Sequence, residues 1–258
     1  MNLTPFEEKI IEHILISSGA GKHAARSALR HLERAWELFE SMPELALFLG
    51  ITAEEESATA VFHCLKRRKY KGAELINTHD HRHKAALHPL LLAIGKAMHE
   101  FKEHNGPKLE FDSELSPSEK ESLRLRITVF NPTGDAIWAY PYPPLHFSIM
   151  LNDVQHDFQP ELSQLASEKE AKTAYEYIKK LANRRNQALY ATEKGIPHAD
   201  KNTEKFLIYR KSVVFSHLIA YLLIEPYAEQ QLFVQQALNV FLSLLKILPH
   251  NQHQDFAS

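Results

Sequence analysis

Hydrophobic residues recur every three to four positions through most of residues 1–104, which is the spacing of a helix with one buried face. Thr4–Glu7 combines a capping threonine, a first-turn proline and a glutamate that completes a capping box, so we expect a helix to begin there. A second helix is predicted over 22–41. After Pro43, a third is predicted over about 45–70, and a fourth from about 78–80 to 104.

The pattern changes after residue 105. Residues 105–120 are rich in Gly, Pro, Ser and acidic side chains, which is typical of a linker. Residues 122–129 alternate between polar and aliphatic side chains, as in a strand with one buried face. Residues 136–140 are predicted to form a returning strand after the turn at 131–135, and 145–151 a third strand. This part therefore predicts a small antiparallel β insertion.

Helical spacing returns for a long helix over 160–190. Two further helices, over 203–224 and 227–248, are apolar nearly all round, which is typical of a bundle centre or a subunit interface. The predicted fold class is mainly α, a helical bundle with a small antiparallel β insertion. The predicted divisions are the helical halves 1–106 and 159–250, the insertion 107–158 and a polar tail 251–258.

Composition agrees with a globular protein. Hydrophobic residues make up 44% and charged residues 24% of the chain, and the 8 glycines favour helices over an all-β fold. The net charge of -2 argues against a broad nucleic-acid-binding surface, although Lys66–Lys69 form a local basic patch. The lone Cys64 excludes an internal disulfide and is typical of a reducing compartment.

Membrane and export signals are not evident. The N-terminal segment lacks a basic stretch followed by an apolar one, so no signal peptide is predicted. The most apolar stretch, Val213–Ile224, is interrupted by Ser216 and His217 and is too short to span a bilayer. We therefore expect a cytoplasmic protein with no membrane contact.

Several charged side chains fall on the helix faces that should be buried. Glu55 lies at the centre of the apolar stripe of the third helix, and Glu54 lies at its edge. A buried charge is costly unless it is paired, so these residues predict a polar network inside the bundle. Such a network can be a structural cluster or a functional site, and both readings stay open. The predicted members are Glu54, Glu55, Asp80, His83, Lys84 and Arg185.

Histidines at alternate positions 79, 81 and 83 suggest a metal site. On a helix, however, only His79 and His83 share a face, and with Glu54 or Glu55 they could bind a metal ion. The paired Glu-x-x-His motifs of di-iron bundles are missing. No metal or cofactor is therefore predicted, and a His/Glu metal-binding protein remains an alternative.

Other common catalytic motifs are missing from the sequence. There is no G-x-S-x-G nucleophile elbow, no P-loop and no G-x-G-x-x-G. Cys64 lies beside the apolar stripe of its helix, which favours a packing role over a nucleophilic one.

Three segments together resemble the AbiV-like abortive-infection branch of the HEPN superfamily of helical-bundle proteins. They are the acidic segment Ala53–Ala58, the segment Asp80–Lys84, and Arg184–Tyr190 with Gly195 and Pro197 after it. The resemblance covers the helical parts of the chain and leaves the β insertion unexplained. It implies a HEPN-like bundle in a phage-defence or toxin-type protein, usually dimeric, that acts on RNA or blocks translation.

The resemblance also implies a site. Catalytic HEPN proteins carry Arg-x(4–6)-His, in which the arginine steers the phosphate and the histidine serves 2′-OH cleavage. At the matching place Arg185 is followed by Tyr190, and a phenol with a pKa of about 10 is a poor substitute for histidine. Arg26 and His31 have the required spacing but point about 140° apart on a regular helix.

A metal-independent ribonuclease would then use Arg185 on the phosphate and His83 for proton transfer. Glu55 and Lys84 would hold the histidine. The candidate catalytic residues are thus His83, Arg185, Glu55, Lys84 and Tyr190. The alternative is a non-catalytic binding protein whose buried charges are structural, so whether the protein is an enzyme stays open. The expected partners are RNA, a second copy of the chain through its apolar C-terminal helices, and a protein of unknown identity.

Overall fold

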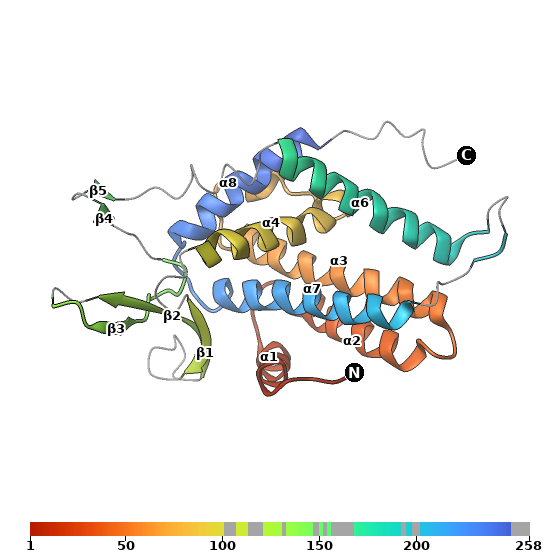
Figure 1. Ribbon diagram of the computed structural model, residues 1–258, viewed down its shortest axis with the longest axis horizontal. Helices are drawn as coiled ribbons and strands as arrows, with labels where there is room; N and C mark the ends of the chain where they lie inside the picture. Colours follow the sequence, from red (N-terminus) through yellow and green to blue (C-terminus); the bar gives the residue numbers. More distant parts are fainter. Residues whose placement is uncertain are drawn as a thin grey trace.

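The computed structural model is mainly helical, with a small antiparallel sheet at one end of the helical body (Figure 1). It describes residues 1–100, 107–112, 121–130, 133–146, 150–151, 154–155, 168–191, 195–197 and 202–248. The helices are α1 (Pro5–Ile16), α2 (Lys22–Leu38), α3 (Pro43–Arg67), the 3₁₀ turn η1 (Ala73–Leu75), α4 (His81–Glu100), α6 (Glu168–Leu189), α7 (Thr203–Ile224) and α8 (Leu232–Ile247).

The predicted start of α1 is confirmed. The Thr4 hydroxyl accepts a hydrogen bond from the Glu7 backbone N–H at 3.2 Å, and the Glu7 carboxylate accepts one from the Thr4 N–H at 2.8 Å. This reciprocal pair satisfies two backbone donors at the helix start. Pro43 lies in the first turn of α3, where its missing N–H costs nothing.

Helices α3 and α7 form the centre of the bundle. Helix α3 packs between α2 and α7, while α4 and α6 cover its other side. This arrangement explains why α7 is apolar nearly all round. By length and composition α7 could cross a membrane, yet most of it is buried among the other helices, as in the core helix of a soluble protein.

The described sheet has the order β1-β2-β3 and is antiparallel throughout. Strands β2 (Ser122–Phe130) and β3 (Ala136–Ala139) confirm the predicted hairpin. Strand β1 (Lys108–Asp112) pairs with β2, although 105–120 was expected to be a linker. Only five residues of this strand alternate between polar and apolar, which is too short a pattern to predict a strand within a segment rich in glycine, proline and serine.

The third strand predicted over 145–151 does not join this sheet. Residues 145 and 146 are not in a strand, and 147–149 lie outside the described residues. The two-residue strands β4 (Met150–Leu151) and β5 (Val154–Gln155) pair only with each other. The predicted tail 251–258 and the predicted helix start at 160 also lie outside the described part.

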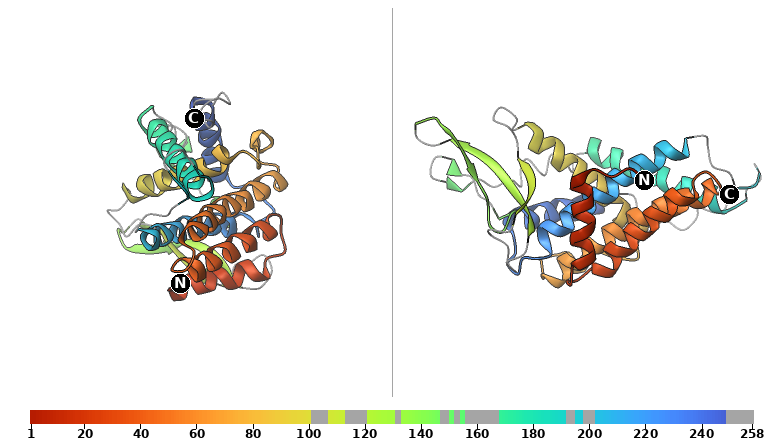
Figure 2. Two further views of the ribbon diagram at one scale, coloured as in Figure 1. Left: turned by 90° about the vertical axis from the view of Figure 1, so that its right-hand side faces the viewer. Right: turned by 90° about the horizontal axis from the view of Figure 1, so that it is seen from below.

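The β insertion lies at one end of the helical body and contacts it through several residues (Figure 2). Phe111 of β1 stacks on His13 of α1, with ring centroids 4.5 Å apart. Near the start of α8, the fully buried Gln231 accepts a hydrogen bond from the Leu145 N–H at 2.6 Å and donates one to the Leu223 carbonyl at 2.8 Å. The β insertion therefore packs against the helical bundle and is hydrogen-bonded to it.

Candidate functional site

The bundle centre contains a buried charged network of Glu54, Tyr177 and Arg210. Glu54 of α3 is fully buried and forms an ion pair with Arg210 of α7. The Tyr177 hydroxyl of α6 donates to Glu54 at 2.8 Å and accepts from Arg210 at 2.6 Å. Burial raises the pKa of Glu54, and the Arg210 guanidinium opposes that rise. This network links α3, α6 and α7 through hydrogen bonds in the interior of the bundle.

The network corrects the predicted helix faces. Glu55 was expected at the centre of the buried stripe and Glu54 at its edge, but Glu54 is the fully buried residue and Glu55 is partly exposed. Helix α3 is packed on several sides, so a single stripe does not describe its buried surface. Arg210 was missed, although an arginine inside an otherwise apolar helix was a visible signal.

Two buried histidines extend the network. The His217 Nδ1 lies 2.8 Å from the Ser57 hydroxyl, and the His88 Nε2 lies 2.8 Å from the Tyr209 hydroxyl. Burial lowers the pKa of His217 to about 3 and that of His88 to about 4. Both imidazoles are therefore neutral at pH 7, which avoids placing further positive charge beside Arg210.

A second polar cluster lies at the surface and consists of Glu55, His81 and Arg185. The Nδ1 of His81 lies 2.7 Å from Oε1 of Glu55, and Nη1 of Arg185 lies 3.1 Å from Nε2 of His81. The His81 side chain is 54% exposed and that of Glu55 is 12% exposed. Helices α3, α4 and α6 each supply one member, so a carboxylate, an imidazole and a guanidinium meet where solvent reaches them.

The structure thus brings two of the predicted site residues, Glu55 and Arg185, to one place, but with His81 between them rather than His83. His81 was expected to point to one side of α4. That side faces Glu55 and Arg185, because α3 and α6 approach the first turn of α4 from there. Helical phase within α4 could not show from which side its neighbours come.

His83 has a different role. Its Nδ1 accepts a hydrogen bond from the Asn77 N–H at 3.0 Å, and its Nε2 lies 3.8 Å from Oδ2 of Asp80. Burial lowers the pKa of His83 although Asp80 opposes this. These contacts stabilise the turn before α4.

The other two candidates also lie apart from the cluster. Lys84 is half-buried and forms no hydrogen bond or ion pair with Glu55 or Arg185. Tyr190 directly follows α6 and is 62% exposed. The structure therefore does not bring His83, Lys84 and Tyr190 together with Arg185.

The remaining sequence candidates occupy structural positions. Arg26 donates hydrogen bonds to carbonyls at the end of α1, including that of Leu15 at 2.6 Å. Arg68, in the basic patch, donates to the Glu225 carbonyl. Cys64 is buried, and burial raises its pKa to about 12, which keeps the thiol protonated and unreactive.

The alternative hypothesis of a His/Glu metal site requires several ligand side chains close together, and the described part of the chain has no such group. No group of three or more His, Cys, Asp or Glu side chains there is placed to hold a metal ion. Glu55 contacts His81 and forms no hydrogen bond or ion pair with His79 or His83, the pair that the spacing had suggested.

Comparison with protein-family models, with curated proteins and with solved structures finds no match to this chain. The function must therefore be argued from the geometry of the chain itself.

Proposed function

We propose that this chain is a HEPN-like protein that acts on RNA, and that Glu55, His81 and Arg185 cleave RNA without a metal ion. The observation that carries this proposal is the meeting of these three side chains at the protein surface. The phage-defence or toxin-type role rests on the resemblance of the three sequence segments. A cytoplasmic location remains a prediction.

The proposed chemistry follows from the hydrogen bonds of His81. Glu55 accepts the Nδ1–H, so Nε2 carries no proton and accepts a hydrogen bond from Arg185 in the free protein. When Arg185 turns to the phosphate of a bound RNA, the Nε2 lone pair becomes available as a base. His81 Nε2 takes the proton of a ribose 2′-OH, and the 2′ oxygen attacks the adjacent phosphorus. The bond from phosphorus to the 5′ oxygen breaks, and His81 returns the proton to that oxygen. The products are a 2′,3′-cyclic phosphate and a 5′-OH.

Arg185 supplies positive charge beside the reacting histidine. In the free protein its guanidinium lies against His81, 3.1 Å from Nε2. When RNA binds, this guanidinium is placed to pair with the phosphate, whose negative charge increases as the 2′ oxygen attacks. The electrostatic role matches the one expected for Arg185 from the resemblance.

The test compares two neighbouring histidines. Purified protein is incubated with total RNA in the presence of a chelator, and fragments are resolved by electrophoresis. We expect wild-type protein to cleave, and His81→Ala to cleave at least about 10²-fold more slowly, the usual contribution of general acid–base catalysis. His83→Ala is the matched control and should keep its activity, because His83 forms no hydrogen bond or ion pair with the cluster.

Two outcomes contradict the proposal. One is the absence of fragments with folded wild-type protein at any ionic strength. The other is an equal loss of activity in both variants when melting temperatures show that both are folded.

The homodimer also remains a prediction. The apolar residues of α7 that suggested it pack mainly within the chain, while Ile208 and Tyr209 are 50% and 43% exposed. Sedimentation velocity across a concentration series measures the oligomeric state. A monomer at all concentrations would contradict the dimer.

A further inference from the structure

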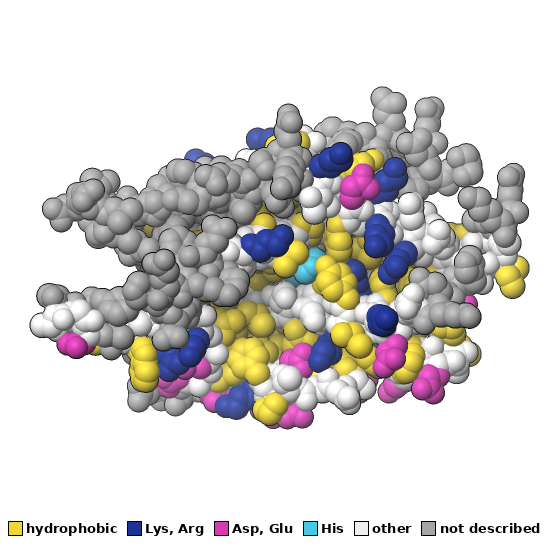
Figure 3. Space-filling model, in the orientation of Figure 1, with side chains coloured by type: hydrophobic (Ala, Val, Ile, Leu, Met, Phe, Trp, Pro, Cys, Tyr) yellow, Lys and Arg dark blue, Asp and Glu magenta, His cyan; other side chains and the backbone are white. Residues whose placement is uncertain are grey.

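A cleft of about 350 Å³ lies between α6 and α7, next to the buried Glu54–Arg210 pair. This volume lies within the range of small-ligand sites. Figure 3 shows Lys and Arg side chains gathered over this face, with hydrophobic side chains between them. The residues that line it include Tyr177, Lys180, Arg184, Lys205, Tyr209 and Arg210.

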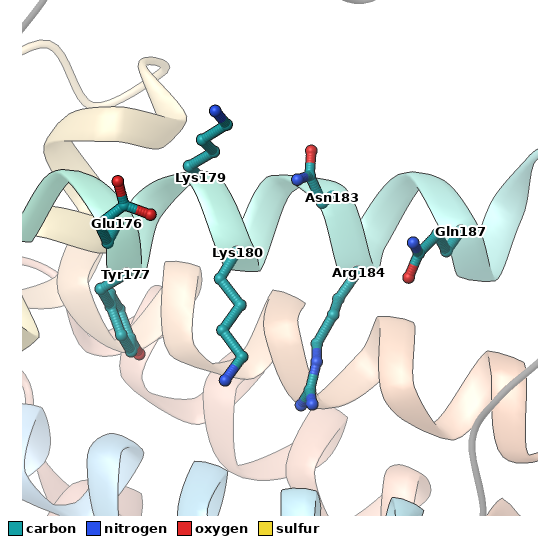
Figure 4. Close-up of a pocket in the computed structure, with 7 residues that line it drawn as sticks. All are labelled: Glu176, Tyr177, Lys179, Lys180, Asn183, Arg184 and Gln187. Atoms are coloured by element: carbon teal, nitrogen blue, oxygen red, sulfur yellow. The ribbon is translucent and has the colours of Figure 1, made fainter.

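One wall of the cleft is a face of α6. Tyr177, Lys180 and Arg184 are spaced three and four residues apart, so they lie on one side of the helix. Figure 4 shows these three side chains pointing the same way, while Lys179 points away from them. A second hollow of about 500 Å³ runs along α6 and shares all three residues. The basic wall therefore continues beyond the cleft.

The cleft is positively charged. Lys180 and Lys205 are exposed and have no ion-pair partner among the described residues. No Asp or Glu is among the described residues that line this cleft, and Glu176 borders only the adjoining hollow. Basic side chains from two helices, with no carboxylate among the described lining residues, favour an anionic ligand.

The buried end of the cleft has an unused hydrogen-bond donor. The Arg210 side chain is only 5% exposed, and Nη1 donates to Glu54 and Tyr177. Its Nε is buried and has no hydrogen-bond partner among the described residues. A buried donor without an acceptor is costly and rare in folded proteins, so an acceptor supplied by a ligand is a physical explanation for it.

The opposite wall is aromatic. Tyr209 of α7 is 43% exposed, and its hydroxyl is held by His88 at 2.8 Å, so the orientation of its ring is fixed. Fixed and accessible aromatic rings stack on the bases of single-stranded nucleic acids. Positive charge beside such a ring matches the phosphate and the base of one nucleotide.

We propose that the cleft between α6 and α7 binds a nucleotide unit of single-stranded RNA. The phosphate lies among Lys180, Arg184 and Lys205, and the base stacks on Tyr209. The proposal deepens the proposed action on RNA and rests on it. Arg184 lines this cleft while the next residue, Arg185, contacts His81, so one strand that crosses α6 reaches both places.

The test measures binding without cleavage. A fluorescent single-stranded oligonucleotide made of 2′-O-methyl ribonucleotides has no 2′-OH to react, so its anisotropy reports binding alone. We expect Lys180→Gln/Lys205→Gln to weaken binding at least roughly tenfold, equivalent to about 1.4 kcal/mol. The salt dependence of binding should also become shallower, by about 0.7 in log–log slope for each lost phosphate contact.

The controls isolate the cleft. Lys172→Gln/Lys246→Gln removes the same two charges from exposed positions that line neither hollow, and should leave binding nearly unchanged. Tyr209→Leu should weaken oligonucleotide binding and leave inorganic phosphate binding unchanged. Adenosine monophosphate is titrated in parallel. If it competes with the oligonucleotide, the cleft binds a free nucleotide as well as RNA. Binding of the oligonucleotide alone assigns it to the RNA strand.

Absence of oligonucleotide binding, or equal weakening of it by Lys172→Gln/Lys246→Gln and by Lys180→Gln/Lys205→Gln, would overturn the proposal. Because the probe cannot be cleaved, this result is independent of the His81→Ala cleavage test. Wild-type protein that binds the oligonucleotide but yields no fragments from RNA contradicts the catalytic proposal alone.

Discussion

At the scale of single residues, two adjacent glutamates have opposite environments. Glu54 is fully buried against Arg210, whereas Glu55 reaches the surface and meets His81. Neighbours on a helix point about 100° apart, so one can face α7 while the next faces the start of α4. The first carboxylate holds the bundle together, and the second is available for chemistry.

The buried histidines predict acid sensitivity. Burial lowers the pKa of His217 to about 3 and that of His88 to about 4, from the usual 6.5 of histidine. Between these values the unfolded chain binds more protons than the folded one, so stability increases with pH there. We expect the free energy of unfolding, measured in urea, to be maximal above pH 6.5 and to decrease progressively toward pH 4.

Replacing one buried histidine tests whether the buried histidines cause the decrease in stability at acidic pH. His217→Leu should lower stability at pH 7 and flatten the decrease between pH 6.5 and 4. His79→Asn, a change at an exposed histidine, should leave the curve unaltered. An unchanged slope in His217→Leu would show that other groups cause the acid sensitivity.

At the scale of elements, the junction between α2 and α3 depends on one glycine. Gly21 caps the start of α2 with φ of 88°, and a Cβ there would lie 2.4 Å from the Ala60 carbonyl oxygen of α3. Only glycine combines this left-handed backbone with so close an approach of two helices. Gly21 therefore sets how closely α2 and α3 pack.

Replacing two glycines that have the same φ separates the cost of the left-handed backbone from the cost of the close approach of the two helices. Gly21→Ala should lower the free energy of unfolding by more than about 2 kcal/mol, because backbone strain and a clash with Ala60 add. Gly134→Ala has the same φ of 88° and open space around it, so it should cost only about 1 kcal/mol. Equal costs, measured by chemical denaturation, would show that the close approach is unimportant.

At the scale of the whole molecule, the β insertion and the helices form a connected structure. Gln231 joins the loop after β3 to the end of α7, and its own N–H donates to the Tyr70 hydroxyl at 2.9 Å. Tyr227 and Phe111 add aromatic contacts between the insertion and the helical body. The insertion should therefore unfold together with the bundle.

Adjacent glutamines test this coupling. Gln231→Ala leaves the Leu145 N–H and the Leu223 carbonyl without a partner, which should cost about 1–3 kcal/mol. Amide exchange in β2 should increase at the same time. Gln230→Ala removes exposed bonds to the carbonyls of Arg68 and Lys69 and should cost less than about 1 kcal/mol. Unchanged exchange in β2 would show that the insertion is independent.

The sequence by itself determined the structural features that depend on residues close together in the chain. The capping box at Thr4, the helices over 203–224 and in the N-terminal half, and the hairpin of β2 and β3 were predictable because their signals are local. It also placed Glu55 and Arg185 in one polar network, but inside the bundle, whereas the structure has them together with His81 at the surface.

Only the tertiary structure decided which groups meet. Periodicity gives the direction of a side chain relative to its own helix axis and contains no information on which helix lies in that direction. The choice of His81 over His83, the burial of Glu54 against Arg210 and the cleft between α6 and α7 all depend on how separate helices pack. The candidate site was therefore predictable in its residue types, and its members were settled by packing.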